Sequence, residues 1–396
     1  MAVIINQAGT PMTTLISLLG KGKNDPVTGY KTARYRFDDG SVHEEPFFGL
    51  ALARYIQPQR LIVAGTAGSM WDVLLQQQAA EDETVLQLME AVEQEAVTQA
   101  LLSSCEPHLS RHLGVPVTCL LINYARNEEE QASILLNLAD VLSAREQVVI
   151  DVTHGFRHLP MLALVAARYL SRVRQVKIEE LYYGALEMTA QNETPVLRLG
   201  SLLQMLDWVE SLATYEKDGD YGVFAPLLER DGMPHEKAAL LQKAAFFERT
   251  GNPVRAAETL RSVFEAISQH MGALGGLFRD SLTQRVSWFR NNGRSAWEQS
   301  LSDAYLERGD YLRAATYLYE SVITRATVDS GSDPNNFADR KAAYEPFRNE
   351  SSRDLEFLRN SMAHGIRPMG KRSAQHLQSQ AALASKLSEL RKELGS

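Results

Sequence analysis

The chain is poor in cysteine, with only Cys105 and Cys119 among its 396 residues. Two thiols are too few for a zinc cluster, and a secreted protein of this length usually carries more. We therefore expect both to fill packing positions in a cytoplasmic protein. The sequence also lacks 18 successive apolar residues and a basic segment ahead of its first apolar run, so neither a membrane span nor a signal peptide is predicted.

An excess of positive charge is missing as well. The chain has 41 Lys and Arg against 49 Asp and Glu, a formal net charge of −8. A protein that holds nucleic acid along a broad basic surface usually has the opposite balance, so any RNA would be engaged at a small catalytic cleft. With 44% hydrophobic and 23% charged residues, the composition is that of a globular protein, and the length predicts two domains.

The first half of the chain alternates short apolar segments with helical ones. This order predicts an α/β domain over residues 1–205, in which helices cover both faces of a mostly parallel sheet. The predicted strands are 14–19, a hairpin of 30–37 with 42–45, and then 61–64, 117–122, 148–150 and 178–183. The predicted helices are 47–55, 81–104, 128–142 and 160–173.

The second half, residues 206–396, predicts an all-α domain. Residues 248–257 and 307–315 echo each other, since each combines a helix end, a glycine turn and a new helix start. The echo predicts two helical hairpins, which are too few for a solenoid. The clearest helical segments are 208–215, 237–249, 254–271 and 311–328, with a loop at 329–336 and a charged last helix over 371–396.

One candidate ligand site follows the predicted strand 148–150, at the strand end where ligands bind in parallel sheets. Residues 151–158 place Thr153, His154 and Arg157 around a glycine turn at the start of a helix. Backbone N–H groups at a helix start attract anions, so a phosphate or a nucleotide suits this segment. A turn in which the polar residues cap the helix and His154 is packed explains the same residues, and both interpretations stay open.

A second candidate segment, residues 65–72, follows the strand at 61–64. Thr66 and Ser69 have hydroxyl groups that can donate to a phosphate, and Trp71 could stack on a base. Aromatic side chains more often pack in a core, which favours a capping turn with a buried Trp71. Residues 20–24 contain no G-x-G-x-x-G pattern, so a dinucleotide-dependent dehydrogenase is poorly supported.

The helical half offers candidate catalytic residues near the end of one predicted helix. Asn360 and His364 are four positions apart and share a helix face, while Arg359 precedes them and Gly365 ends the helix. A histidine can act as general acid or base, and an arginine can hold a phosphate. These groups suffice to make an RNA 2′-hydroxyl attack its own phosphate without a metal. The spacing alone is weak, because a histidine at a helix end is common and the pattern recurs at 230–235, a predicted loop.

Several motifs taken together favour the catalytic interpretation of these residues over an ordinary helix end. The chain resembles the ancillary ribonucleases of type III CRISPR systems, in which a CARF domain senses cyclic oligoadenylate and a HEPN domain cleaves RNA. The motifs occur in the family's order over nearly the whole chain, and Asp-x-Thr-His-Gly-Phe-Arg is a specific signal. The matching segments are 15–22, 65–72, 151–160, 182–187 and 359–364.

For the first half, the resemblance implies a Rossmann-like CARF domain that pairs with a second copy about a two-fold axis. Its ligand would be a ring lying across that axis, cyclic tetra-adenylate in the first place and cyclic hexa-adenylate as the runner-up. The resemblance leaves open whether the sensor also degrades this ligand with help from His154 or Thr153. The implied ligand contacts are Gly20, Thr66, Ser69, Trp71, Thr153, His154, Gly155 and Arg157.

For the second half, the resemblance implies a HEPN ribonuclease that cleaves single-stranded RNA in antiviral defence, with no metal site. Arg359, Asn360 and His364 would form a composite site with their copies in a homodimer or a higher homo-oligomer of dimers. Two rival hypotheses remain: a non-catalytic sensor whose helical domain recruits a partner, and a helical-repeat adaptor. Residues 324–350 and the extension 1–11 have no predicted role.

Overall fold

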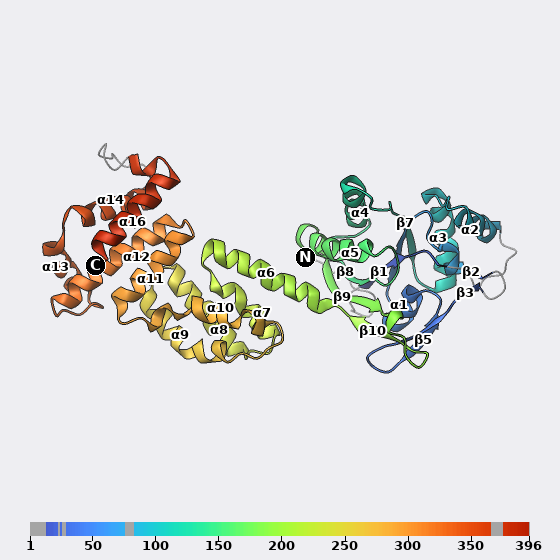
Figure 1. The fold of residues 1–396 in the computed structure, drawn as a ribbon, viewed down its shortest axis with the longest axis horizontal. Coiled ribbons are helices and arrows are strands. Elements are labelled where there is room, and N and C mark those ends of the chain that lie inside the picture. The colour runs from blue at the N-terminus through green and yellow to red at the C-terminus, as the bar shows by residue number, and fades with distance from the viewer. Residues whose placement is uncertain (1–12, 23, 26–28, 76–82, 366–374, 396) are drawn as a thin grey trace. The chain divides into compact units, whose positions relative to one another are not determined.

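A computed structural model describes residues 13–22, 24–25, 29–75, 83–365 and 375–395 (Figure 1). The chain divides into two compact units, Met1–Gln204 and Met205–Ser396, next to the predicted boundary between 205 and 206. The functions assigned to the two units stay predictions. The extension 1–11 and the start of the predicted last helix, 371–374, lie outside the described residues.

The first unit contains the predicted α/β fold. Its sheet has eight strands in the order β5-β4-β10-β9-β8-β1-β6-β7, and a two-stranded sheet joins β2 (Asn24–Asp25) to β3 (Gly29–Tyr30). The five strands from β9 to β7 run parallel, whereas β10 is antiparallel to β9. The eight strands are β1 (Thr13–Leu19), β4 (Ala33–Arg36), β5 (Val42–Glu45), β6 (Arg60–Gly65), β7 (Val117–Leu121), β8 (Gln147–Asp151), β9 (Lys177–Gly184) and β10 (Thr194–Arg198).

Both faces of this sheet are buried, as its apolar strands require. Alternate residues of β1 belong to two separate cores: Leu15 and Leu19 to one, Ile16 and Leu18 to the other. Helices α1 (Phe48–Ile56) and α3 (Gln99–Leu113) complete the first core, and α4 (Glu128–Asp140) with α5 (His158–Val173) the second (Figure 1). The parallel strands therefore aim their carboxyl ends at one edge of a rigid sheet.

Two sequence-based expectations for this unit are wrong in detail. The single helix predicted over 81–104 is two helices, α2 (Glu83–Glu93) and α3, because Glu95 adopts a left-handed φ of 52° and the Thr98 side chain caps α3. Strand β10 was not predicted, since its five residues contain a proline, although it pairs with β4 on one side and β9 on the other. Cys105 and Cys119 are buried, as expected of packing residues.

The second unit is helical throughout its described residues, which is consistent with the predicted HEPN-like fold. The echo at 248–257 and 307–315 marks two helical hairpins, α8 with α9 and α11 with α12. None of the described helices is both long and apolar enough to cross a membrane. The helices are α6 (Gly200–Asp218, which spans the boundary), α7 (Ala225–Arg230), α8 (His235–Arg249), α9 (Pro253–Ser268), α10 (Gly275–Arg285), α11 (Arg294–Glu307), α12 (Tyr311–Asp329), α13 (Phe337–Phe347), α14 (Glu350–His364) and α16 (Gln380–Leu394).

Candidate ligand pocket and catalytic helix

The loops after β1 and β8 meet at the carboxyl edge of the sheet. A Cβ atom at Gly20 would lie 2.5 Å from the backbone nitrogen of Gly155 and 3.3 Å from Cβ of His154, so only glycine fits there. Gly155 itself has a φ of 110°, a conformation that other residues rarely adopt. The two glycines thus let two backbone segments approach each other at the ends of β1 and β8.

The loop after β6 is held against β1 by its own hydroxyl groups. The Ser69 hydroxyl accepts a hydrogen bond from the Thr66 N–H at 2.9 Å and donates to the Leu19 carbonyl at 2.8 Å. The Met70 N–H donates to the Gly20 carbonyl at 2.9 Å. Because both ends of the loop are tied to β1, Thr66 and Ser69 are fixed in position before any ligand arrives.

The loop after β8 is anchored by a buried carboxylate. Asp151 accepts a hydrogen bond from the Ser17 hydroxyl and another from the Thr153 N–H, the latter at 2.8 Å. Burial raises the pKa of Asp151 to about 6, although both hydrogen bonds oppose that rise. The Thr153 hydroxyl in turn accepts the Gly184 N–H at 2.8 Å, so this segment is tied to β1 and β9 together.

His154 supports this loop from behind. Its Nε2 accepts a hydrogen bond from the Phe48 N–H at 3.2 Å, and its ring lies 5.3 Å from that of Phe47, both at the start of α1. Burial lowers the pKa of His154 to about 4. The imidazole is therefore neutral at pH 7, and its acceptor nitrogen is already occupied by the protein backbone.

These loops enclose a pocket of about 200 Å³ at the carboxyl edge of the sheet. Sequence analysis missed Lys21, although the Gly-Lys-Gly run of 20–22 was a visible signal, and it missed Phe156, an aromatic side chain that is 44% exposed. Lys21 is exposed and forms an ion pair with Glu95. The lining residues are Leu19, Gly20, Lys21, Thr66, Ser69, Gly155, Phe156 and Leu159, which include four of the eight predicted ligand contacts.

The other four predicted contacts do not line this pocket. Thr153 and His154 brace the loop as described, and Arg157 is exposed at the start of α5. Trp71 is fully buried, and its indole N–H donates to the Thr66 carbonyl at 2.9 Å. No face of Trp71 is exposed in this structure, which agrees with the buried turn that the residues favoured, whereas the Trp71 contact implied by the resemblance stays a prediction.

The candidate catalytic residues lie on α14, as the sequence predicted. The helix begins with a reciprocal pair of hydrogen bonds between Asn349 and Ser352, and it ends at Gly365, whose φ is 72°. His364 is the last residue of the helix, and its side chain is exposed. The final turn therefore presents the imidazole to solvent, where a substrate or a second chain can reach it.

Arg359 is half-buried and turned toward α12. Its Nη1 donates to Oδ1 of Asn360 at 2.6 Å, and its Cζ lies 5.1 Å from the centre of the Tyr319 ring. Five helical positions separate Arg359 from His364, so the two side chains leave the helix about 140° apart. One copy of α14 thus presents the arginine and the histidine on different faces.

The similar spacing at 230–235 does not form a comparable arrangement. Arg230 forms an ion pair with Asp207 at 3.2 Å, and His235 forms one with Glu229 at 2.9 Å. The two residues also belong to different helices, α7 and α8. Among the described residues, no group of three His, Cys, Asp or Glu side chains is arranged to hold a metal ion.

Comparisons with known proteins bear on the first unit above all. Residues 14–187 match the model of a family described as CRISPR system endoribonuclease Csx1, CARF domain. The chain is also 25% identical over 257 residues to CRISPR-associated protein MJ1674 of Methanocaldococcus jannaschii, an alignment that covers 59% of this chain and 40% of that relative. The chain thus spans two fifths of the length of the curated relative it matches. The CARF domain inferred from the sequence motifs is confirmed, whereas the roles of individual residues stay predictions.

Proposed function

Because this chain is a CARF-containing protein of the type III CRISPR ancillary class, we propose that it is a metal-independent endoribonuclease activated by cyclic oligoadenylate. Its substrate is single-stranded RNA, cleaved in antiviral defence. The observation that carries the proposal is the placement of Arg359, Asn360 and His364 in the last two turns of one exposed helix end. The runner-up is a sensor without catalytic activity that recruits a partner through its helical unit.

The pocket at the carboxyl edge of the sheet is the proposed sensor site. Its volume of about 200 Å³ is below the range for a drug-sized ligand, and it suits one part of a cyclic tetra-adenylate ring rather than the whole. Two copies facing each other across a two-fold axis would supply the rest. Lys21 and the backbone N–H groups near Gly155 then meet phosphates, and Phe156 replaces Trp71 as the surface for an adenine.

The proposed reaction is attack of the RNA 2′-oxygen on the adjacent phosphorus, with departure of the 5′-oxygen of the next nucleotide. The 2′-hydroxyl loses a proton and the leaving oxygen gains one, and His364 is suited to both transfers as a general acid and base. The Arg359 guanidinium stabilises the charge that develops on the phosphate. Asn360 orients Arg359 through the hydrogen bond at 2.6 Å.

A composite site explains why one chain alone shows the arginine and the histidine on different faces of α14. In a homodimer, or in a higher homo-oligomer of dimers, His364 of one copy can approach Arg359 of the other. Ligand binding must then stabilise the arrangement in which these groups meet, because a ligand shifts an equilibrium only by its differential affinity for the two states.

The test is cleavage of a fluorescent single-stranded RNA in the presence of EDTA, with cyclic tri-, tetra- or hexa-adenylate or no ring. Wild type is compared with His364→Ala and with His235→Ala, a matched variant of an exposed histidine outside the site. We expect cyclic tetra-adenylate to switch on cleavage in wild type and His235→Ala and to have no effect on His364→Ala. Binding of a ring without any cleavage by wild type would favour the non-catalytic sensor.

A further inference from the structure

A second pocket, of about 390 Å³, opens beside Arg359 in the helical unit. Its walls come from α12, α13 and α14, and Arg359 itself is part of the lining. Helix α13 belongs to segment 324–350, to which the sequence motifs assign no role. The pocket therefore joins an unexplained segment to the proposed catalytic arginine.

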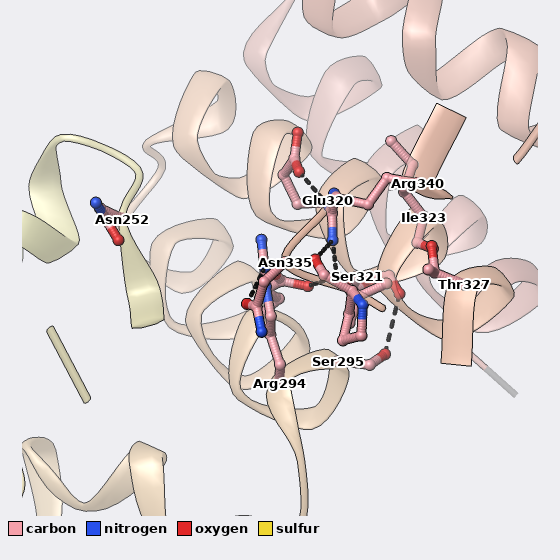
Figure 2. Close-up of polar contacts among 12 residues, drawn as sticks. Asn252, Arg294, Ser295, Glu320, Ser321, Ile323, Thr327, Asn335 and Arg340 are labelled. Atoms are coloured by element: carbon pink, nitrogen blue, oxygen red, sulfur yellow. Dashed lines mark hydrogen bonds and ion pairs between the residues drawn. The ribbon is translucent and has the colours of Figure 1, made fainter. Parts of the chain in front are cut away.

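Polar contacts fix α13 and the loop before it in place. Arg340 of α13 forms an ion pair with Glu320 of α12 at 2.6 Å and donates to the Pro334 carbonyl at 3.0 Å (Figure 2). Arg294 of α11 donates to the same carbonyl at 2.9 Å and to Asn335 Oδ1 at 3.3 Å. Two arginines from different helices thus hold one loop, so α13 forms a fixed wall of the pocket.

Three aromatic side chains line this pocket, and one of them is largely exposed to solvent. Phe337, the first residue of α13, is 82% exposed. This exposure is unfavourable, because burial of a large apolar side chain stabilises a folded protein. Tyr319 and Tyr344 also line the pocket, with their rings edge to face at 5.4 Å. An open aromatic face beside a polar cavity is the feature on which proteins stack the bases of single-stranded nucleic acids.

Four cations and three carboxylates line this pocket, the third carboxylate being Glu345, and two of the cations are outside the ion pairs. Arg340 is matched by Glu320, and Arg348 forms an ion pair with Glu356 at 2.9 Å. Among the described residues, Lys341 and Arg359 have no carboxylate within ion-pair distance, and Lys341 is exposed. In a chain with a net charge of −8, such a local excess of cations next to an aromatic ring suits a phosphate followed by a base.

We propose that this α13 pocket binds one nucleotide of the RNA substrate, next to the phosphate that is cut. The base stacks on Phe337, the phosphate of that nucleotide contacts Lys341, and Arg359 holds the neighbouring scissile phosphate. The inference deepens the proposed ribonuclease function and rests on it. It gives segment 324–350 a role in substrate binding.

The test measures binding of a fluorescein-labelled single-stranded RNA by anisotropy, with cyclic tetra-adenylate present and in a His364→Ala background that leaves the RNA intact. Phe337→Ala should weaken binding about 5- to 150-fold, the range for loss of one base stack, and Phe337→Trp should restore it. Lys341→Ala should lower the salt slope of log Kd by about 0.7. The matched controls are Phe246→Ala, which is 61% exposed on α8, and Lys392→Ala, which is exposed on α16.

Cleavage kinetics of the same substitutions with His364 intact separate this inference from the proposed function. We expect KM to rise with kcat nearly unchanged, because stacking stabilises substrate and transition state alike. If the ring-activated enzyme cleaves RNA and Phe337→Ala matches Phe246→Ala in both assays, nucleotide binding in the α13 pocket is refuted, whereas the proposed ribonuclease function is supported. If RNA binding depends on Phe337 but no ring elicits cleavage, the pocket remains an RNA-binding site, whereas the proposed ribonuclease function is refuted and with it the position of the nucleotide next to a scissile phosphate. If wild type binds no RNA at all, both are overturned.

Discussion

A buried glutamate makes the stability of the helical unit depend on pH. Glu248, at the end of α8, is 4% exposed, and its carboxylate accepts hydrogen bonds from the Trp288 indole at 2.9 Å and the Tyr305 hydroxyl at 3.0 Å. Its backbone carbonyl accepts the Tyr317 hydroxyl. Glu248 thereby connects the first helical hairpin to the second. Burial raises its pKa from 4.5 to about 7, against the opposing effect of these hydrogen bonds.

The direction of the pH effect follows from that shift. The folded unit binds the Glu248 proton more tightly than the unfolded chain, so the contribution to stability is complete below pH 4.5 and is lost as pH rises through about 7. A pKa difference of this size corresponds to about 3 kcal/mol. Glu248→Gln stays neutral and keeps an oxygen for the Trp288 indole. It should therefore match wild type near pH 5 and exceed its stability at pH 8.

Urea unfolding at pH 5 and pH 8 checks this expectation by tryptophan fluorescence, since three of the four tryptophans lie in residues 205–396. At pH 8 the midpoint of Glu248→Gln should lie on the order of 1 M higher than that of wild type. Glu236→Gln, an exposed position on the same helix, should keep the wild-type pH dependence. If the unfolding midpoints of wild type and Glu248→Gln differ by the same amount at pH 5 and at pH 8, the reasoning is refuted.

Three further predictions concern the ligand pocket. Gly20→Ala places a Cβ atom 2.5 Å from a backbone nitrogen, so calorimetry should show a loss of cyclic tetra-adenylate affinity of about tenfold or more, whereas Gly276→Ala, with open space around it, should not. Phe156→Ala should weaken the same binding about 5- to 150-fold through lost base stacking, and Met161→Ala, a position on α5 that is 72% exposed, should leave it unchanged. Because burial raises the pKa of Asp151 to about 6, the first unit should lose stability as pH rises from 4 through 6, and Asp151→Asn should abolish that loss in thermal melts.

Most strands and helices were predictable because their pattern of apolar residues is decided by burial. The strand at 14–19 has apolar residues on both faces because both faces of the sheet are covered, and this run of apolar residues can be recognised in the sequence alone. The break at Glu95 was not predictable, since a left-handed conformation at a glutamate has no sequence signature. Strand β10, which lies between β4 and β9, was missed for a related reason: its five residues include a proline and have no continuous apolar run.

In the candidate sites, features that depend on neighbouring residues in the sequence were predictable, whereas contacts between segments far apart in the chain were not. Gly20, Thr66, Ser69 and Gly155 were predictable because small and polar residues directly follow strands whose ends meet. The burial of Trp71 agrees with the general preference of aromatic side chains for a core, although the residues that surround it come from segments far apart in the chain and could not be named in advance. The contact of Arg359 with Tyr319 joins two helices forty positions apart, and no spacing rule within α14 could have indicated it.

An RNA substrate is compatible with the acidic composition, because the ion pairs at the α13 pocket do not include all of its cations. An excess of carboxylates disfavours a long run of phosphates, so a broad RNA-binding surface is excluded by the same net charge of −8 that the sequence shows. A short contact is different, because Lys341 and Arg359 lack carboxylate partners among the described residues while their neighbours Arg340 and Arg348 are paired. The lining of the pocket therefore has one more cation than carboxylates, although the whole chain is acidic. With only one or two phosphates bound there, base stacking on Phe337 must supply much of the affinity, and cleavage should depend more on the base at that position than on the length of the RNA.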